Sequence, residues 1–213
     1  MLQRSLKLNP FPAQFRSAAD PLIGPVINYR SASVLPDAGE RDGGTVYVTL
    51  GTIFNTESGD LLARLSTASA AAAGVRSVIV ATGEHLDPAG LGPQPEAVTA
   101  YRFVAQHEVL STCSAVVCHG GSGTVLDAIS HGLPLVLLPL GADQPLNAQR
   151  CSALGCGVVL PADTVGAEQI TRAVDEVLTQ PSYRAASARL RAGLMQLPGP
   201  DDVIRTLTRL WAA

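Results

Sequence analysis

The sequence predicts an α/β protein with a doubly wound, Rossmann-like parallel sheet. From residue 45 onward, short apolar runs alternate with segments of helix length. Three of these runs, SVIVA at 77–81, AVVCH at 115–119 and LVLLP at 135–139, contain almost no polar residue. A strand of this composition is buried on both faces, which is typical of a parallel sheet covered by helices on both sides.

The apolar runs and the segments between them give the order of the expected elements. Strands are expected near residues 45–50, 75–81, 97–103, 114–118, 134–138 and 156–160. Helices are expected near residues 57–73, 106–112, 122–131, 143–154, 166–179, 181–196 and 201–211. Residues 1–42 contain five prolines and no sustained period, so we interpret them as a linker or tail and residues 43–213 as one domain.

The composition indicates a single domain whose partner is a small molecule. A chain of 213 residues buries enough surface to form a core without disulfides or a metal. Charged residues make up 15% and hydrophobic residues 46%, which excludes a disordered tail. The net charge of −3 argues against a nucleic-acid or anionic-membrane surface.

The cysteines and the N-terminal sequence indicate the cellular compartment of the protein. The four cysteines form two C-x4-C pairs inside apolar segments, so we expect buried free thiols, and no histidine pair has the spacing of a metal site. The N-terminus has no apolar run of a signal peptide, and the stretch 133–140 contains two prolines and is too short to span a membrane. We therefore expect a cytoplasmic protein without a metal or cofactor.

A glycine-rich turn follows the strand AVVC and begins the next helix. It consists of His119, Gly120, Gly121, Ser122, Gly123 and Thr124. Glycines let backbone N–H groups approach an anion, and the helix N-terminus adds a partial positive charge that favours phosphate. The alternative is a tight turn that needs glycine dihedrals and whose hydroxyls cap the helix.

Three better-known glycine motifs do not fit this turn. A Walker loop needs a lysine after its last glycine, and the only lysine is Lys7. A dinucleotide fingerprint follows the first strand, but GTIFNTESGD at 51–60 does not contain it. Thr124 replaces the last glycine of a hydrolase nucleophile elbow. These spacings argue against a Walker-type ATPase, an NAD enzyme and a nucleophilic Ser122.

Three further polar residues lie beside this turn or the next one. Asp127 is placed on the phosphate side of its helix, where it could accept hydrogen bonds from ribose hydroxyls or complement the helix dipole. Asp143 and Gln144 begin the next helix, where they could bind the vicinal hydroxyls of a sugar or form an N-cap.

The run from RFVAQHE to LNAQR, at 102–150, resembles the donor-binding signature of family-1 glycosyltransferases. It is most similar to that of bacterial enzymes that glycosylate macrolides and other natural products. VYVTLGT at 46–52 and LPGPDDVIRTLTRL at 197–210 extend the resemblance over most of 45–213. The resemblance implies the C-terminal half of a two-domain GT-B enzyme, with residues 1–42 as the connecting segment and the N-terminal half outside this chain.

The resemblance also implies residues for the nucleoside. Phe103 would stack on the nucleobase, Val104 would offer backbone hydrogen bonds to its edge, and Gln106 would shape the pocket. Asp127 stands where plant relatives carry a ribose-binding glutamate. Ala105 replaces a common proline, which implies a less rigid loop.

The remaining implied contacts concern the diphosphate and the sugar. His119 and the turn 120–124 would hold the diphosphate, with Thr52 nearby. Asp143 and Gln144 match the pair that binds the hydroxyls of the transferred sugar.

The implied function is binding of a UDP- or TDP-sugar for inverting transfer to a small natural-product acceptor, which the N-terminal half outside this chain would bind. No D-x-D sequence is present, so we expect no metal, and we assign no catalytic residue to this chain because the family's base lies in the other half. A non-catalytic nucleotide-sugar-binding subunit of a split enzyme and half of a sugar-nucleotide 2-epimerase remain alternatives. A homodimer is possible. The acceptor, the sugar and the choice of UDP or TDP are not predicted.

Overall fold

The computed structural model describes residues 6–16, 24–31, 43–52 and 58–211. Its central feature is a parallel sheet of six strands in the order β5-β4-β3-β6-β7-β8. The strands are β3 (Thr45–Thr49), β4 (Ser77–Ala81), β5 (Val98–Tyr101), β6 (Ala115–Cys118), β7 (Leu135–Leu137) and β8 (Gly157–Val159). The predicted fold class and all six predicted strands are confirmed.

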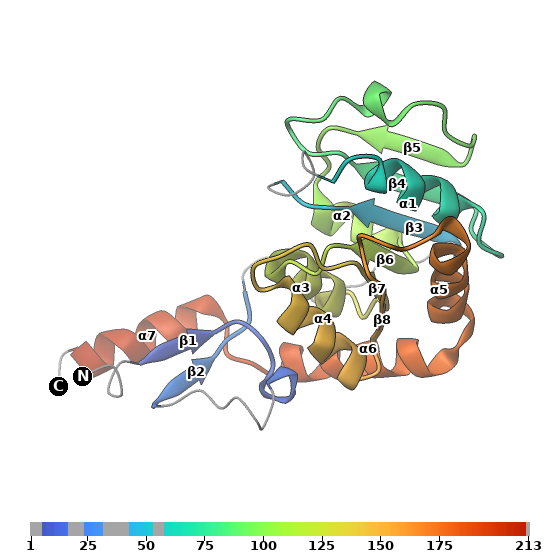
Figure 1. The fold of residues 1–213 in the computed structure, drawn as a ribbon. Helices are drawn as coiled ribbons and strands as arrows, with labels where there is room; N and C mark the ends of the chain where they lie inside the picture. The colour runs from blue at the N-terminus through green and yellow to red at the C-terminus, as the bar shows by residue number, and fades with distance from the viewer. Residues whose placement is uncertain (1–5, 17–23, 32–42, 53–57, 212–213) are drawn as a thin grey trace.

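Seven α-helices accompany the sheet in the described part of the chain (Figure 1). They are α1 (Leu61–Ala70), α2 (Gln106–Thr112), α3 (Ser122–Ser130), α4 (Gln144–Ala153), α5 (Ala167–Thr179), α6 (Pro181–Met195) and α7 (Pro200–Trp211). Each corresponds to a predicted helix. The expected start of the first helix, at residue 57, lies outside the described residues.

The alternation of side chains along the strands produces two cores, one on each face of the sheet. Val46 and Val48 of β3 pack with α1 and α5 on one face. Tyr47 points to the other face, which α2, α3, α4 and α6 cover. Both faces of the sheet are therefore buried, as the apolar runs predicted.

The four cysteines are buried free thiols, as predicted. All four, Cys113, Cys118, Cys151 and Cys156, belong to the core on the face of the sheet that α2, α3, α4 and α6 cover. Cys118 ends β6 directly below the glycine-rich turn, and burial raises the pKa of its thiol to about 12. This thiol is protonated at neutral pH and serves as an apolar core residue.

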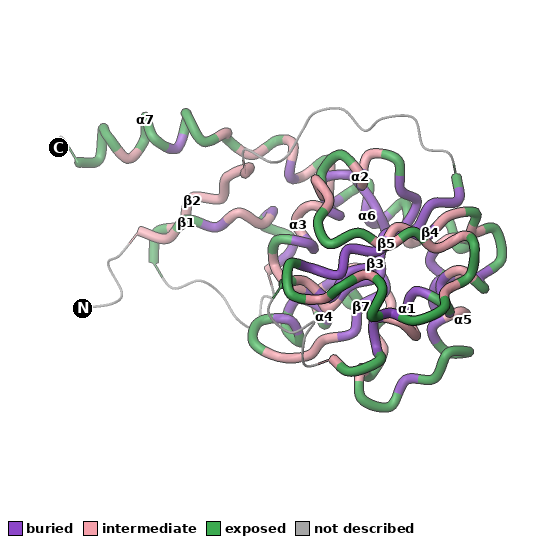
Figure 2. The backbone as a smooth tube through the Cα atoms, turned by 90° about the horizontal axis from the view of Figure 1, so that it is seen from above, coloured by how far each residue is buried: buried purple, intermediate pink, exposed green. Residues whose placement is uncertain are grey.

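Two short parallel strands that the sequence did not predict lie near the N-terminus. β1 (Lys7–Asn9) pairs with β2 (Val26–Asn28), and the 3₁₀ helix η2 (Ala13–Phe15) lies between them in sequence. Strands of three residues are too short to show a period. Figure 1 shows that β1, β2 and α7 project together from one side of the six-stranded sheet. Figure 2 shows that most of α7 is exposed.

Hydrogen bonds attach the N-terminal segment to the main body. The Arg150 guanidinium of α4 donates to the backbone oxygens of Gln14, Phe15 and Arg16, over 2.7–3.1 Å. Phe15 is buried in the core that includes α6. The interpretation of residues 1–42 as a linker stays a prediction. Within the described ranges, no helix combines the length and the apolar composition that a membrane crossing requires.

Replacing Gly157 by alanine should destabilise the fold. A Cβ there would lie 2.9 Å from the Leu135 carbonyl oxygen and 2.6 Å from Leu137 Cδ1, and the carbonyl belongs to the adjacent strand. Overpacking of this kind costs about 1–3 kcal/mol, which should lower the Tm in a thermal melt by several degrees.

Gly90→Ala is the matched control. A Cβ at Gly90 would meet its nearest atom only at 3.9 Å, so the Tm should stay near that of the wild type. Equal melting temperatures for the two variants would contradict the packing argument.

Candidate functional site

A cavity of about 750 Å³ opens at the carboxyl ends of the strands. The chain first runs from β3 to β5 and then returns to place β6 beside β3, so the loops diverge at this point in the sheet. Such a switch point is where doubly wound sheets bind ligands. All the site residues predicted from the sequence line this cavity except Gly120: Thr52, Phe103, Val104, Gln106, His119, Gly121, Ser122, Gly123, Thr124, Asp127, Asp143 and Gln144.

The glycine-rich turn directs the N-terminus of α3 at the cavity. Gly120 has a φ of +86°, which favours glycine, and Gly121 precedes the first helical residue. Gly120 lies behind the turn, where a Cβ would face the Gln144 backbone oxygen at 3.3 Å. The first N–H groups of a helix have no acceptor within it, so those of residues 122–124 can bind an anion.

The His119 ring occupies a slot between two glycines. A Cβ on Gly51 would lie 2.8 Å from the ring, and a Cβ on Gly121 would lie 2.5 Å from Nε2. The ring therefore fits only because both neighbours lack a side chain. Its Nδ1 is buried and has no hydrogen-bond partner among the described residues. Burial lowers the pKa of His119, and the nearby Asp143 carboxylate opposes part of this effect.

A hydrogen-bond network joins the glycine-rich turn to the start of α4. The Ser122 hydroxyl donates to Asp143 Oδ2 over 2.5 Å, and Asn147 Nδ2 donates to the same oxygen over 3.0 Å. Asn147 also donates to the Gly120 carbonyl oxygen over 3.0 Å. The hydrogen bond from Ser122 is the main cause of the lowered pKa of Asp143, so this carboxylate stays ionised at neutral pH.

Gln144 lies in the same loop but is buried and turned toward the backbone. Its Oε1 accepts hydrogen bonds from the N–H groups of Leu140 at 2.7 Å and Gly141 at 3.1 Å. Ala142, between Gly141 and Asp143, has a φ of +53°, which is uncommon for a residue with a Cβ. Gln144 thus holds the loop in its conformation, and Asp143 is the carboxylate that the loop presents to the cavity.

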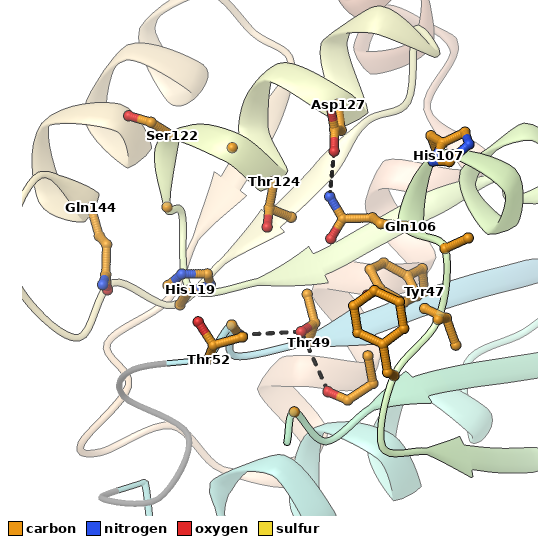
Figure 3. A pocket seen from close by; sticks show the side chains of 18 of the residues that line it. Tyr47, Thr49, Thr52, Gln106, His107, His119, Ser122, Thr124, Asp127 and Gln144 are labelled. Carbon is orange, nitrogen blue, oxygen red and sulfur yellow. Dashed lines mark hydrogen bonds between the residues drawn. The ribbon is translucent and has the colours of Figure 1, made fainter. Parts of the chain in front are cut away.

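The opposite end of the cavity combines an aromatic ring with a second polar pair. Gln106 Nε2 donates to Asp127 Oδ2 over 2.6 Å (Figure 3). This direct hydrogen bond links α2 to α3 and fixes the position of the Asp127 carboxylate. Phe103 follows β5 and is 84% exposed at the rim, so one face of its ring is available for stacking.

Several residues that line or support the cavity were missed from the sequence. Tyr47 and Thr49 of β3 line it, and Thr49 Oγ1 accepts the N–H of Gly51 over 3.1 Å (Figure 3). Burial raises the pKa of Tyr47 to about 12, so its hydroxyl is neutral. Tyr47 and Thr49 belong to an apolar strand, whose pattern points to the core. Asn147 lies one turn after Asp143, and that spacing could have indicated it.

Comparison with known proteins identifies a matching family and two relatives. The family model described as "Erythromycin biosynthesis protein CIII-like, C-terminal domain" matches residues 66–210. The 3-alpha-mycarosylerythronolide B desosaminyl transferase of Saccharopolyspora erythraea is 33% identical over 180 residues, 84% of this chain and 42% of the relative. The aklavinone 7-beta-L-rhodosaminyltransferase of Streptomyces galilaeus is 35% identical over 167 residues, 78% of this chain and 38% of the relative.

Solved structures of glycosyltransferases share the fold. The spinosyn rhamnosyltransferase SpnG complexed with thymidine diphosphate has a TM-score of 0.80 at 28% identity, covering 94% of this chain and 56% of that one. The calicheamicin glycosyltransferase CalG4 has a TM-score of 0.79 at 29% identity, covering 96% and 54%. This chain therefore spans about half the length of the proteins it matches.

The lowered pKa of His119 should make the stability of the fold depend on pH. The ordinary histidine pKa of about 6.5 applies in the unfolded chain, so below that pH the unfolded chain binds more protons than the folded one. The stability that the neutral His119 ring contributes is complete above about pH 6.5. It is lost as the pH falls from about 6.5 toward the lowered pKa of His119 in the folded chain. His119→Gln should therefore lose less stability than the wild type in urea titrations between about pH 7.5 and pH 5.

His85→Gln provides the control, because His85 is exposed in a turn outside the cavity. It should keep the pH dependence of the wild type. If His119→Gln and the wild type lost the same stability on acidification, burial of the His119 ring would not be the cause of the pH dependence.

Proposed function

The chain belongs to the family of C-terminal domains like that of erythromycin biosynthesis protein CIII, and from this premise we propose that it binds a nucleoside diphosphate sugar for transfer to a natural-product acceptor. The observation that carries the proposal is the N-terminus of α3 at the cavity, with His119 held beside it in a glycine slot. That arrangement suits a diphosphate. The two relatives are named as a desosaminyl transferase and a rhodosaminyltransferase, which supports transfer of a sugar.

The order of the strands supports one orientation of the donor. Phe103 follows β5, His119 follows β6 and Asp143 follows β7, and β6 lies between the other two strands in the sheet. A diphosphate at His119 then places the nucleoside toward Phe103 and Asp127, and the sugar toward Asp143. The ionised Asp143 carboxylate can accept hydrogen bonds from the sugar hydroxyls.

In the proposed reaction, the oxygen of an acceptor hydroxyl bonds to C1 of the sugar while the bond from C1 to the β-phosphate oxygen breaks. The electron pair of that bond leaves with the nucleoside diphosphate, and the hydroxyl proton passes to a base that we assign to no residue of this chain. The N–H groups of α3 and the His119 ring stabilise the negative charge on the leaving diphosphate. We take inversion at C1 from the resemblance to family-1 enzymes, and independence of metal from the lack of a D-x-D sequence.

We also propose that the chain associates with a second copy of itself, since α7 exposes Ile204, Leu210 and Trp211. Light scattering of the purified chain tests the association.

Thymidine diphosphate should bind to the chain, and His119→Ala should weaken this binding about tenfold or more. A charge-assisted hydrogen bond contributes about 1.5–3 kcal/mol, and about 1.4 kcal/mol corresponds to a factor of ten. Isothermal titration calorimetry of the wild type and the variant measures the difference. His85→Ala is the control and should bind like the wild type.

Asp143→Ala should separate the sugar from the diphosphate. We expect nearly unchanged affinity for thymidine diphosphate and a weaker affinity for the nucleotide sugar, because Asp143 is assigned to the sugar hydroxyls. Equal affinity of the wild type and His119→Ala for the diphosphate would contradict the assignment of His119. A variant Asp143→Ala that lost the diphosphate as well would place the phosphates nearer to α4.

A further inference from the structure

The side-chain amide of Asn147 joins two parts of the cavity wall that the proposed function assigns to different parts of the donor. Its Nδ2 lies 3.0 Å from the Gly120 carbonyl oxygen, 3.1 Å from Ser122 Oγ and 3.0 Å from Asp143 Oδ2. Gly120 and Ser122 belong to the glycine-rich turn assigned to the diphosphate, and Asp143 is the carboxylate assigned to the sugar. One amide therefore contacts both parts of the wall.

We propose that Asn147 is a positioning residue for sugar recognition. It directs the Asp143 carboxylate at the sugar while the glycine-rich turn has the conformation that accepts a diphosphate. This inference rests on the proposed function, because one ligand spans both parts of the wall only if it is a nucleoside diphosphate sugar. Asn147 does not itself line the cavity at the carboxyl ends of the strands, so it acts on the ligand through Asp143.

The neighbours of the Asn147 amide determine which of its two ends faces them. A backbone carbonyl and an ionised carboxylate only accept hydrogen bonds, so the atom between Gly120 and Asp143 must be the donor Nδ2. The Ser122 hydroxyl donates its proton to Asp143 over 2.5 Å and accepts a hydrogen bond from Asn147. That proton is therefore used by the carboxylate, and the turn binds phosphate through its backbone N–H groups.

Helix α4 gives the amide a fixed position. The backbone N–H of Asn147 donates to the Asp143 carbonyl oxygen over 3.1 Å, so the two side chains lie one turn apart on the same face of the helix. Ala148 and Cys151 of this helix are buried in the core. Asn147 is itself only 8% exposed. Turning a buried amide away from its partners leaves buried acceptors without a donor, so the amide keeps this orientation.

The diphosphate and sugar parts of the site depend on each other through this amide. A diphosphate bound at the N-terminus of α3 stabilises the turn. The turn carries the Gly120 carbonyl oxygen and the Ser122 hydroxyl, which hold the Asn147 amide and the Asp143 carboxylate in place. A ligand that contains both a diphosphate and a sugar therefore meets a carboxylate that is already oriented, which lowers the entropic cost of binding.

Isothermal titration calorimetry of the 213-residue chain with thymidine diphosphate and with thymidine diphosphate glucose tests the coupling. The quantity compared is the sugar preference, defined as the Kd of the diphosphate divided by the Kd of the nucleotide sugar. Asn147→Ala should weaken the diphosphate about threefold and the nucleotide sugar about tenfold, because only the second ligand uses the carboxylate. The sugar preference should therefore fall about threefold.

Gln149→Ala is the matched control. Gln149 carries an amide on the same helix, but it is exposed and lies outside the cavity at the carboxyl ends of the strands. Its replacement should leave the sugar preference of the wild type unchanged. A loss of preference as large as that of Asn147→Ala would contradict a specific role of Asn147.

A double-mutant cycle separates positioning from a purely structural role. If Asn147 acts through Asp143, adding Asn147→Ala to Asp143→Ala should change the sugar preference by less than about twofold. An equal loss of preference in both backgrounds would overturn the proposal, because Asn147 would then act independently of Asp143. Weakening of both ligands by the same factor in Asn147→Ala would overturn it as well. If Asn147→Ala lacks the native circular dichroism spectrum, Asn147→Ser takes its place in the cycle.

Ser122→Ala tests the link from the turn to the carboxylate independently of α4. It removes the second donor to Asp143 and should also lower the sugar preference, and an unchanged preference would overturn the coupling. If the wild type binds both ligands in that case, the proposed function stands. A wild type that binds neither ligand would count against the function itself.

Discussion

The parallel pairing of β3 with β6 is the constraint on which the rest of the site depends. It places strands that are 66 residues apart in register, with Thr49 opposite Cys118. Both strands then end at the same edge of the sheet, so His119, the first residue after β6, and Gly51, the second residue after β3, lie next to each other. A shift of β6 by one residue would reverse the faces of its side chains and move His119 out of the slot.

In the slot that holds the His119 ring, packing and chemistry restrict which residue types the same positions can carry. Gly51 and Gly121 leave room for an imidazole ring at the N-terminus of α3. A Cβ at either position would lie 2.5–2.8 Å from the ring, so a side chain there would displace it. These glycines therefore matter for the position of His119, and Gly120 matters for the turn itself, since its φ is positive. Glycines within one short motif thus have different physical roles.

Local patterns predicted the sheet, the helices, the glycine-rich turn and the polar residues beside it. The remaining predicted residues of the cavity lining, Thr52, Phe103, Val104 and Gln106, came from the resemblance to family-1 glycosyltransferases. Apolar runs identify buried strands, and strand-to-helix turns must lie at the carboxyl edge of a parallel sheet. What the sequence did not predict depends on contacts between distant segments. The bond from Gln106 to Asp127, the role of Asn147 at Gly120, and the pairing of β1 with β2 join residues whose neighbours no local pattern reveals. Tyr47 was missed because a strand residue in an apolar run points to the core, and it does lie there while also lining the cavity.

The charges beside the glycine-rich turn bear on which group removes the acceptor proton in the proposed transfer. Asp143 is the carboxylate there, and the hydrogen bonds from Ser122 and Asn147 that lower its pKa also make it a weak base. It is suited to accept hydrogen bonds from sugar hydroxyls and poorly suited to remove the acceptor proton. The pKa of His119 is lowered as well, and its ring is enclosed by Gly51 and Gly121 on the diphosphate side. In the proposed transfer, the described residues at this end of the cavity are therefore suited to position the donor, and the proton acceptor has to be a group other than Asp143 and His119.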